Sequence, residues 1–109
     1  MKKEKWYKFQ EWIAEYFKEL DPHARCSKAS GARGEAGDVT NSIGINCEAK
    51  CYNKKNVWDV DWLTKCEEEI PLHSNKLAIV VTENKDGQKH VHLKFEDFWK
   101  IYKEWYQAK

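Results

Sequence analysis

The segment 76–82, Lys-Leu-Ala-Ile-Val-Val-Thr, is the most apolar continuous run in the chain and constrains the fold more than any other feature. Its length and its β-branched residues are typical of a strand that is buried on both faces. A strand of this kind lies inside a sheet that helices flank. The run therefore predicts a mixed α/β fold with a central sheet.

Helical periodicity precedes and follows this strand. Apolar residues recur every three or four positions in three segments, which predicts three amphipathic helices. Pro22 ends the first helix and Pro71 the second, because proline interrupts helical backbone. In chain order the expected elements are a helix at 3–20, strands at 23–27, 38–40 and 43–50, a helix at 57–70, strands at 76–82 and 89–94, and a helix at 96–106. This order predicts a single domain over residues 1–109.

The composition bears on what fills the core. Ile, Leu, Val and Phe total 21 residues, a low share that in a strongly charged chain would indicate disorder. The 15 aromatic residues and the near-zero net charge argue against disorder here. We therefore expect Trp, Tyr and Phe to build the core. The same reasoning predicts a place in the core or on a dimer surface, rather than a base-stacking role, for Trp58, Trp62, Trp99 and Trp105.

The charge balance excludes one class of nucleic-acid-binding protein. Lys and Arg number 19 and Asp and Glu 18, so the chain is not a histone-like polycation and any contact with DNA must use local patches. No apolar run approaches the roughly 20 residues that span a bilayer, and residues 1–4 lead into an amphipathic stretch instead of a signal-peptide core. We expect a cytoplasmic protein without a membrane partner.

Four cysteines occur, and we expect them to be reduced thiols. Cys47 and Cys51 lie four positions apart, and a zinc site that they form with Cys26 and Cys66 is conceivable. The Cys-x₂-Cys spacing of structural zinc sites is missing, however, and Cys47 shares a strand face with two isoleucines. Packing in the core is therefore the favoured interpretation for Cys47.

The most specific pattern is an acid followed ten residues later by an acid-x-base triplet. If the strands at 38–40 and 43–50 pair as a hairpin around Asn41 and Ser42, Asp38 and Glu48 lie near the same open end. Glu48 and Lys50 project from one strand face because side chains alternate with a period of two. Two carboxylates suit Mg²⁺, and a neighbouring ammonium suits the orientation of a water or a phosphate. The pattern favours hydrolysis of a phosphodiester.

These residues resemble the signature of the PD-(D/E)XK nucleases. Together with the sequence Ser-Gly-Ala at 30–32, they are most similar to small phage and archaeal Holliday junction resolvases, and the similarity extends over nearly the whole chain. The resemblance implies a restriction-endonuclease-like αβββαβ core, with a mixed central sheet flanked by helices and a C-terminal helix. It also implies dependence on Mg²⁺ or Mn²⁺, homodimerisation, a role in DNA recombination and repair, and cleavage of branched DNA such as four-way junctions. A phage-encoded enzyme of this kind acts in the host cytoplasm.

The resemblance also assigns roles to residues. Asp38, Glu48 and the Ala49 carbonyl are expected to hold the metal, and Lys50 to activate the water. On the first helix, Gln10 occupies the position where the family carries Glu, with Glu11 as the second choice. Expected DNA contacts come from the glycine-rich loop and the connector that follows the triplet, at Lys28, Ser30, Gly31, Arg33, Lys54 and Lys55.

Other interpretations stay open at this point. The same core serves nicking, repair and restriction-like nucleases, and the neutral Gln10 would also suit a DNA-binding module without catalysis. A protein-interaction domain that uses its aromatic residues is a third possibility. In purely structural terms, Asp38 caps a turn and Glu48 forms an ion pair with Lys50. His90 and His92 share one strand face, which suits either a metal ion or an exposed side of the strand.

Overall fold

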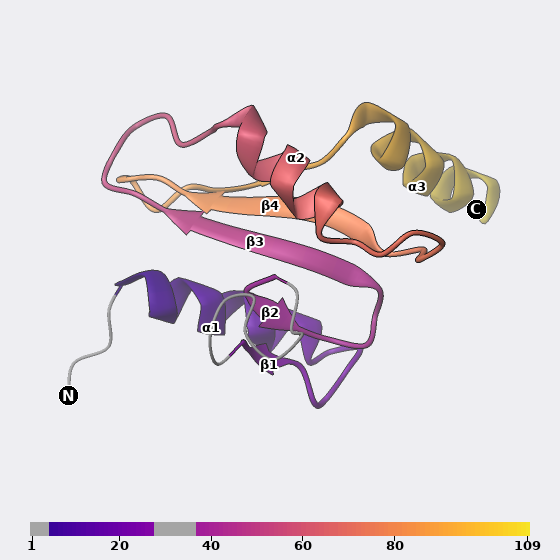
Figure 1. The fold of residues 1–109 in the computed structure, drawn as a ribbon, viewed down its shortest axis with the longest axis horizontal. Helices are drawn as coiled ribbons and strands as arrows, with labels where there is room; N and C mark the ends of the chain where they lie inside the picture. Colours follow the sequence, from indigo (N-terminus) through magenta and orange to yellow (C-terminus); the bar gives the residue numbers. More distant parts are fainter. Residues whose placement is uncertain (1–4, 28–36) are drawn as a thin grey trace.

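The structure, a computed structural model, describes residues 5–27 and 37–109, and it confirms the predicted order of helices and strands (Figure 1). The elements are α1 (Lys5–Phe17), β1 (Arg25–Cys26), β2 (Val39–Thr40), β3 (Ile45–Cys51), α2 (Val60–Glu68), β4 (Leu77–Glu83), β5 (Lys89–His92) and α3 (Phe95–Gln107). The helices are shorter than the periodicity predicts at several ends. α1 stops at Phe17 instead of continuing to Leu20, and α2 starts at Val60, where Asp59 caps it.

The main sheet has three strands in the order β3-β4-β5. β4 runs parallel to β3, from the pair Ile45 and Leu77 to the pair Cys51 and Glu83, and antiparallel to β5. The sheet is therefore mixed, and the coarse α/β prediction is confirmed. β4 is its central strand, which explains why the apolar run is buried, as predicted.

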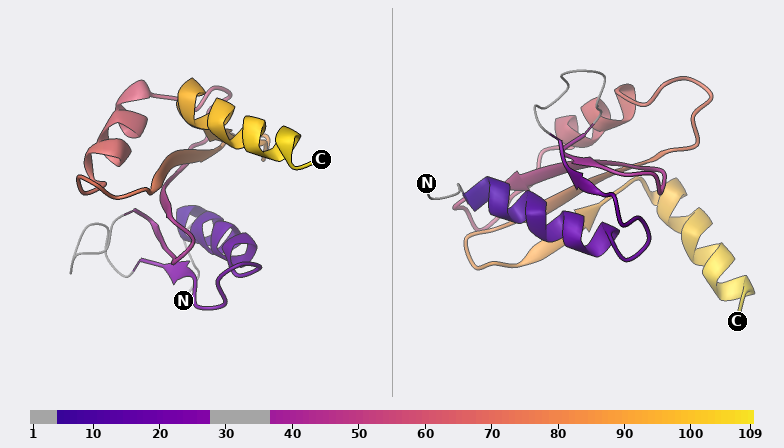
Figure 2. Two further views of the ribbon diagram at one scale, coloured as in Figure 1. Left: turned by 90° about the vertical axis from the view of Figure 1, so that its right-hand side faces the viewer. Right: turned by 90° about the horizontal axis from the view of Figure 1, so that it is seen from below.

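Helices cover the two faces of this sheet. α1, together with the small sheet of β1 and β2, lies on one face, and α2 lies on the other (Figures 1 and 2). Under α1 the buried residues are Phe9, Ile13, Ala14, Val39, Cys47, Ile79 and Val81. Under α2 they are Leu63, Cys66, Ala78 and Val80. Cys47 thus packs in the core, as predicted.

The predicted aromatic core is wrong. Most buried side chains are aliphatic or small, and of the aromatic residues Phe9 is the one that the described residues bury. Trp58, Trp99 and Trp105 are exposed and Trp62 is half-buried. The inward positions of the helices and strands are occupied by Ile, Val, Ala and Cys, so the large rings remain on outer helix positions and in connecting segments.

The predicted hairpin between residues 38–40 and 43–50 is also wrong. β2 pairs antiparallel with β1 instead, and the side chain of Asn41 takes the ladder positions beside β3. Its amide donates to the carbonyls of Val39 (3.0 Å) and Ile45 (2.9 Å), and its oxygen accepts from the Ile45 N–H (3.2 Å). An asparagine side chain can replace backbone hydrogen bonds in this way.

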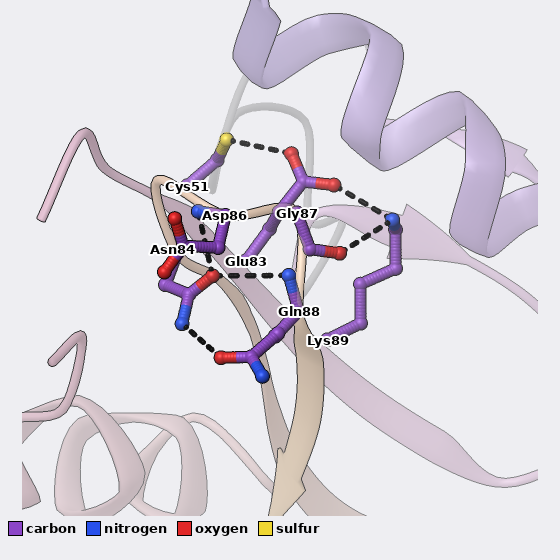
Figure 3. A network of polar contacts seen from close by, with 7 residues as sticks. All are labelled: Cys51, Glu83, Asn84, Asp86, Gly87, Gln88 and Lys89. Atoms are coloured by element: carbon purple, nitrogen blue, oxygen red, sulfur yellow. Dashed lines mark hydrogen bonds and ion pairs between the residues drawn. The ribbon is translucent and has the colours of Figure 1, made fainter. Parts of the chain in front are cut away.

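The turn between β4 and β5 is built around Asn84 and Gly87 (Figure 3). The Asn84 oxygen accepts the N–H groups of Asp86 and Gln88, both at 3.0 Å, and its amide donates to the Gln88 side chain at 2.8 Å. Gly87 has a φ of +76°, which glycine adopts without strain. Asn84 therefore holds the turn together from its centre.

Among the described residues, no helix has the length and apolar character needed to cross a bilayer.

Candidate active site

The five residues assigned to catalysis and metal binding lie around one pocket of about 340 Å³ at the outer edge of β3. Asp38 precedes β2, three of the residues belong to β3, and one comes from α1. Its lining consists of Trp6, Gln10, Asp38, Glu48, Ala49, Lys50, Cys51 and Tyr52. The chain thus brings together residues that are up to forty positions apart in the sequence.

Three backbone contacts place Asp38 in this pocket. The Ser27 N–H donates to the Asp38 carbonyl (2.9 Å), and the Asp38 N–H donates to the Cys47 carbonyl (2.7 Å). The Ala49 N–H then donates to Asp38 Oδ2 at 2.7 Å. Asp38 therefore does cap backbone, as the structural interpretation predicts, but a carboxylate has two oxygens, and within the described residues no hydrogen bond involves Oδ1.

Gly37 allows this close approach. Its φ of +76° is favourable for glycine, and a Cβ placed there would lie 2.5 Å from Asn46 Oδ1 and 2.7 Å from the Cys47 carbonyl oxygen. Proline, with a φ near −65°, could not adopt the same backbone. The glycine therefore lets the chain pass close to Asn46 and Cys47 just before it reaches Asp38.

Glu48 and Lys50 share one face of β3, as the alternation predicts. Their Oε1 and Nζ atoms lie 3.2 Å apart, and both side chains are about three-quarters shielded from solvent. The Lys50 ammonium also lies 5.4 Å from the centre of the Trp62 ring, a cation–π distance. The predicted ion pair is thus present, and it lies at the pocket next to the buried Asp38.

The electrostatics of Asp38 set it apart from an ordinary surface acid. Burial, at 6% exposure, and the charge of the nearby Glu48 together raise the pKa of its carboxyl to about 6. The Ala49 N–H and the Lys50 ammonium oppose the increase. A carboxyl of this kind gains from a neighbouring positive charge, because its charged form is poorly solvated.

The first helix contributes Gln10 to the pocket. Gln10 is buried on α1, whereas Glu11, one position further along, is not among the described residues that line this pocket. The helix turns by about 100° per residue, so only one of the two can face β3. The position matched to the family's glutamate therefore carries a neutral amide in this chain.

Two of the six predicted DNA contacts, Lys54 and Lys55, belong to the described residues. Lys54 is exposed and lines a neighbouring pocket, and Lys55 is exposed beside it. Lys28, Ser30, Gly31 and Arg33 lie outside the described residues.

The two alternative metal sites are not assembled. His92 stacks on Trp58, and its ring lies 6.5 Å from that of His90. Cys47 and Cys66 are buried, Cys66 donates to the Asn46 carbonyl, and all four cysteines are free thiols. Within the described residues, no three His, Cys, Asp or Glu side chains converge on one point.

Two aromatic residues of the pocket escaped the sequence reasoning. Tyr52 follows Lys50 by two positions, so the strand period could have placed it on the same side. Trp6 precedes Gln10 by four positions, which is one helical turn. Both spacings therefore place these residues beside the site, although Tyr and Trp are not the usual ligands of a metal ion.

The donor set at the pocket fits a hard divalent cation. Asp38 and Glu48 supply carboxylates, Ala49 a backbone carbonyl and Gln10 an amide oxygen. Mg²⁺ is typically bound by one or two carboxylates and completes its shell with water and substrate phosphate. A cation here would rest on two carboxylates, which is within that range.

Comparisons with protein-family models, with curated proteins and with solved structures find no match to this chain. The site therefore has to be interpreted from its own residues. What the fold and the pocket define is a mixed α/β protein with an oxygen-rich pocket at the edge of its sheet.

Proposed function

We propose that this protein is a Mg²⁺- or Mn²⁺-dependent DNA endonuclease, specifically one that cuts branched DNA such as four-way junctions. The observation that carries the proposal is the convergence of Asp38, Glu48 and Lys50 at one pocket, with Gln10 opposite. The order α1-β1-β2-β3-α2-β4-β5 also agrees with the αβββαβ core that the nuclease resemblance implies.

The roles follow from the contacts. Asp38, Glu48 and the Ala49 carbonyl would hold the cation, and the Ala49 N–H keeps Asp38 turned toward them. When bound, the cation supplies positive charge that activates a water and offsets charge on the phosphate. Lys50 lies 3.2 Å from Glu48 and can donate hydrogen bonds to the attacking water or to a phosphate oxygen. Gln10 can orient the water through its amide.

The test is a cleavage assay on labelled four-way junction, flap and duplex DNA, each with Mg²⁺ and with a chelator. We expect Mg²⁺-dependent cuts, strongest on the junction. Asp38→Asn should abolish cleavage and retain junction binding, and Lys50→Ala should slow it by about 100-fold or more. Asp86→Asn, an exposed aspartate in the β4–β5 turn, is the matched control. Full nicking by Asp38→Asn would refute the proposal.

The second candidate is a DNA-binding module without catalysis. Gln10 favours it, because a glutamine adds no charge to the cation site, and so does the Glu48–Lys50 ion pair, which leaves Glu48 partly neutralised. This candidate would be supported if Mg²⁺ did not affect junction binding and if the protein cleaved neither the junction nor the flap nor the duplex DNA. A Gln10→Glu variant that acquires cleavage would show that the lost charge is the cause.

The proposed homodimer has a candidate surface on α3. Six aromatic residues at positions 95, 98, 99, 102, 105 and 106 lie along one side of the helix, and each is between 39% and 69% exposed. An aromatic side chain has about 200 Å² of surface, and about half of each of these six is exposed. Together they offer about 600 Å² of exposed surface per copy. Two copies would bury about 1,200 Å², the lower end for specific interfaces. We expect a dimer in sedimentation at micromolar concentrations and a monomer for the variant Trp99→Lys; a dimeric variant would exclude this surface.

A further inference from the structure

A second pocket, of about 240 Å³, adjoins the candidate active site and is largely aromatic. Its walls come from the segment after β3 and from the start of α2, and Tyr52 belongs to both pockets. The lining consists of Tyr52, Lys54, Asn56, Val57, Trp58, Asp59 and Trp62. We call this the aromatic pocket.

The rings of the aromatic pocket pack against one another, and two of them remain partly exposed to solvent. Tyr52 and Trp62 lie nearly parallel, with centroids 5.8 Å apart and 15° between their planes, and Trp58 meets Trp62 edge-on at 6.4 Å. Tyr52 is 42% exposed and Trp58 is 44% exposed. Leaving two large rings half in water sacrifices hydrophobic burial, so the arrangement indicates a ligand rather than a core.

Contacts from three other segments hold the rings in place. The Trp58 indole stacks on His92, with centroids 4.2 Å apart and 13° between the planes, and His92 Nε2 lies 3.0 Å from the Thr82 hydroxyl. The turn between β4 and β5 also holds the segment after β3, because the Lys85 N–H donates to the Lys54 carbonyl at 2.8 Å. Asn84, the centre of that turn in Figure 3, donates to the Lys55 carbonyl at 3.1 Å. The surface is therefore organised before any ligand arrives.

The charges around the pocket select the kind of ligand. Lys50 lies 5.4 Å from the centre of the Trp62 ring and Lys54 lies 5.7 Å from that of Tyr52. These ammonium groups already occupy the cation–π positions, which disfavours a cationic ligand. Asp59 accepts the Asp61 N–H as the cap of α2, so its carboxylate is engaged in the helix. A flat, uncharged group attached to an anionic backbone fits best.

We propose that the aromatic pocket binds one unpaired nucleobase of a DNA strand, next to the phosphodiester that lies at Asp38 and Glu48. Tyr52 lines both pockets, and the active-site Lys50 lies 5.4 Å from the centre of the Trp62 ring, so a phosphate at the active site and a base on the rings would be neighbours on one strand. Aromatic faces beside basic groups are the usual means of holding single-stranded nucleic acid. This inference rests on the proposed nuclease function and narrows its substrate to DNA with an unpaired nucleotide beside the cut.

The test measures affinity in chelator, where cleavage is not needed. Three labelled duplexes are compared by fluorescence anisotropy: one with a single unpaired thymidine, one with an abasic residue at that position and one fully paired. We expect Trp58→Ala to weaken binding of the first by about 5- to 150-fold and to change the other two by less than twofold. Trp58→Phe should recover part of the loss. Tyr16→Ala, which removes an exposed aromatic ring from α1 outside both pockets, is the control.

A spectroscopic signal separates stacking from a general structural effect. With 2-aminopurine as the unpaired base, binding to the wild type should quench its fluorescence, and binding to Trp58→Ala should not. Equal losses on all three duplexes, no loss on any, or unchanged quenching would each overturn the inference.

Cleavage of the same duplexes and of the four-way junction in Mg²⁺ distinguishes the two proposals. Cuts in any of these substrates without any effect of Trp58 on affinity or quenching would refute the aromatic pocket and leave the nuclease. Selective, quenched binding without cuts in any of them, the junction included, would refute the nuclease and leave the pocket.

Discussion

α1 and α3 are both 13 residues long and rich in aromatic residues, yet the protein uses them in opposite ways. α1 lies against the sheet and buries Phe9, Gln10, Ile13 and Ala14. α3 extends away from the sheet (Figure 2), and within the described residues none of its side chains is buried. Equivalent hydrophobic periodicity thus leads to a core helix in one place and an exposed helix in the other.

The inward residues explain the difference. α1 carries the small Ala14 on its inward side, so its backbone can approach β3 closely. The corresponding side of α3 consists of large rings that pack on one another along the helix: Trp99 stacks with Phe95 and with Tyr102, at 6.4 and 5.8 Å between centroids. An amphipathic pattern therefore predicts that a helix has an apolar face, but not which surface covers that face.

The half of the molecule under α1 also contains two central elements of the site. Gly37 with its positive φ and the buried Asp38 both lie there. Changes in this half should therefore affect stability and ligand binding much more than equivalent changes in the half that carries α3.

Matched isoleucines give the largest expected contrast. Ile13→Ala should lower the free energy of unfolding by about 2–5 kcal/mol, because it leaves a cavity between α1 and the sheet. Ile101→Ala, at 48% exposure on α3, should lower it by less than about 1 kcal/mol. Urea denaturation measures both values. Similar losses would mean that α3 is packed as firmly as α1.

Matched glycines, which share a φ of +76°, come next. Gly37→Ala should cost about 2–4 kcal/mol, since its new Cβ meets Asn46 and the Cys47 carbonyl in addition to the backbone strain. Gly87→Ala should cost about 1 kcal/mol, because nothing described lies within 4 Å of its Cβ. Thermal unfolding of the two variants tests this order, and equal costs would show that strain alone matters.

The pKa of Asp38 predicts a pH dependence. In the unfolded chain the carboxyl ionises near 3.8, but in the folded chain its pKa is about 6, so its contribution to stability is greatest below pH 4 and is lost as the pH rises to 6. Asp38→Asn should therefore be more stable than the wild type above pH 6, by up to about 3 kcal/mol, and equally stable near pH 4. Denaturant titrations between pH 4 and 7 measure the difference. A difference that does not vary with pH would contradict the assigned burial.

Metal binding should give the smallest stability change. Mg²⁺ at about five times its dissociation constant should stabilise the wild type by about 1 kcal/mol, and it should leave Asp38→Asn unaffected. Gln10→Ala should weaken Mg²⁺ binding by about 10-fold, whereas Gln107→Ala on α3 should not change it. Calorimetric titration provides both affinities. Equal binding by all four proteins would place the cation elsewhere.

Much of the candidate site could be predicted from short-range patterns. Glu48 and Lys50 share a face because alternation along a strand needs no information from the rest of the chain. The choice of Gln10 over Glu11 follows in the same way from helical rotation beside Phe9 and Ile13. The buried strand at 77–83 was visible in its apolar run.

The larger errors concern contacts between distant residues. β2 was expected to pair with β3 but pairs with β1, and the Asn41 side chain takes the place of the expected ladder. The expected aromatic core is the second error: Trp58 is exposed and stacks on His92, a residue 34 positions away in the chain, and its place on a dimer surface stays a prediction. No local spacing reports either contact.

The sequence by itself determined where the helices and strands form and which side chains share each face, since those properties depend on neighbours within a few residues. Only the tertiary structure decided which faces are covered, and therefore that α1 is buried and α3 is not. It also decided the burial of Asp38, whose surroundings come from α1, β1 and β3. Burial and the pKa that depends on it are set by segments far apart in the chain, so no local pattern contains them.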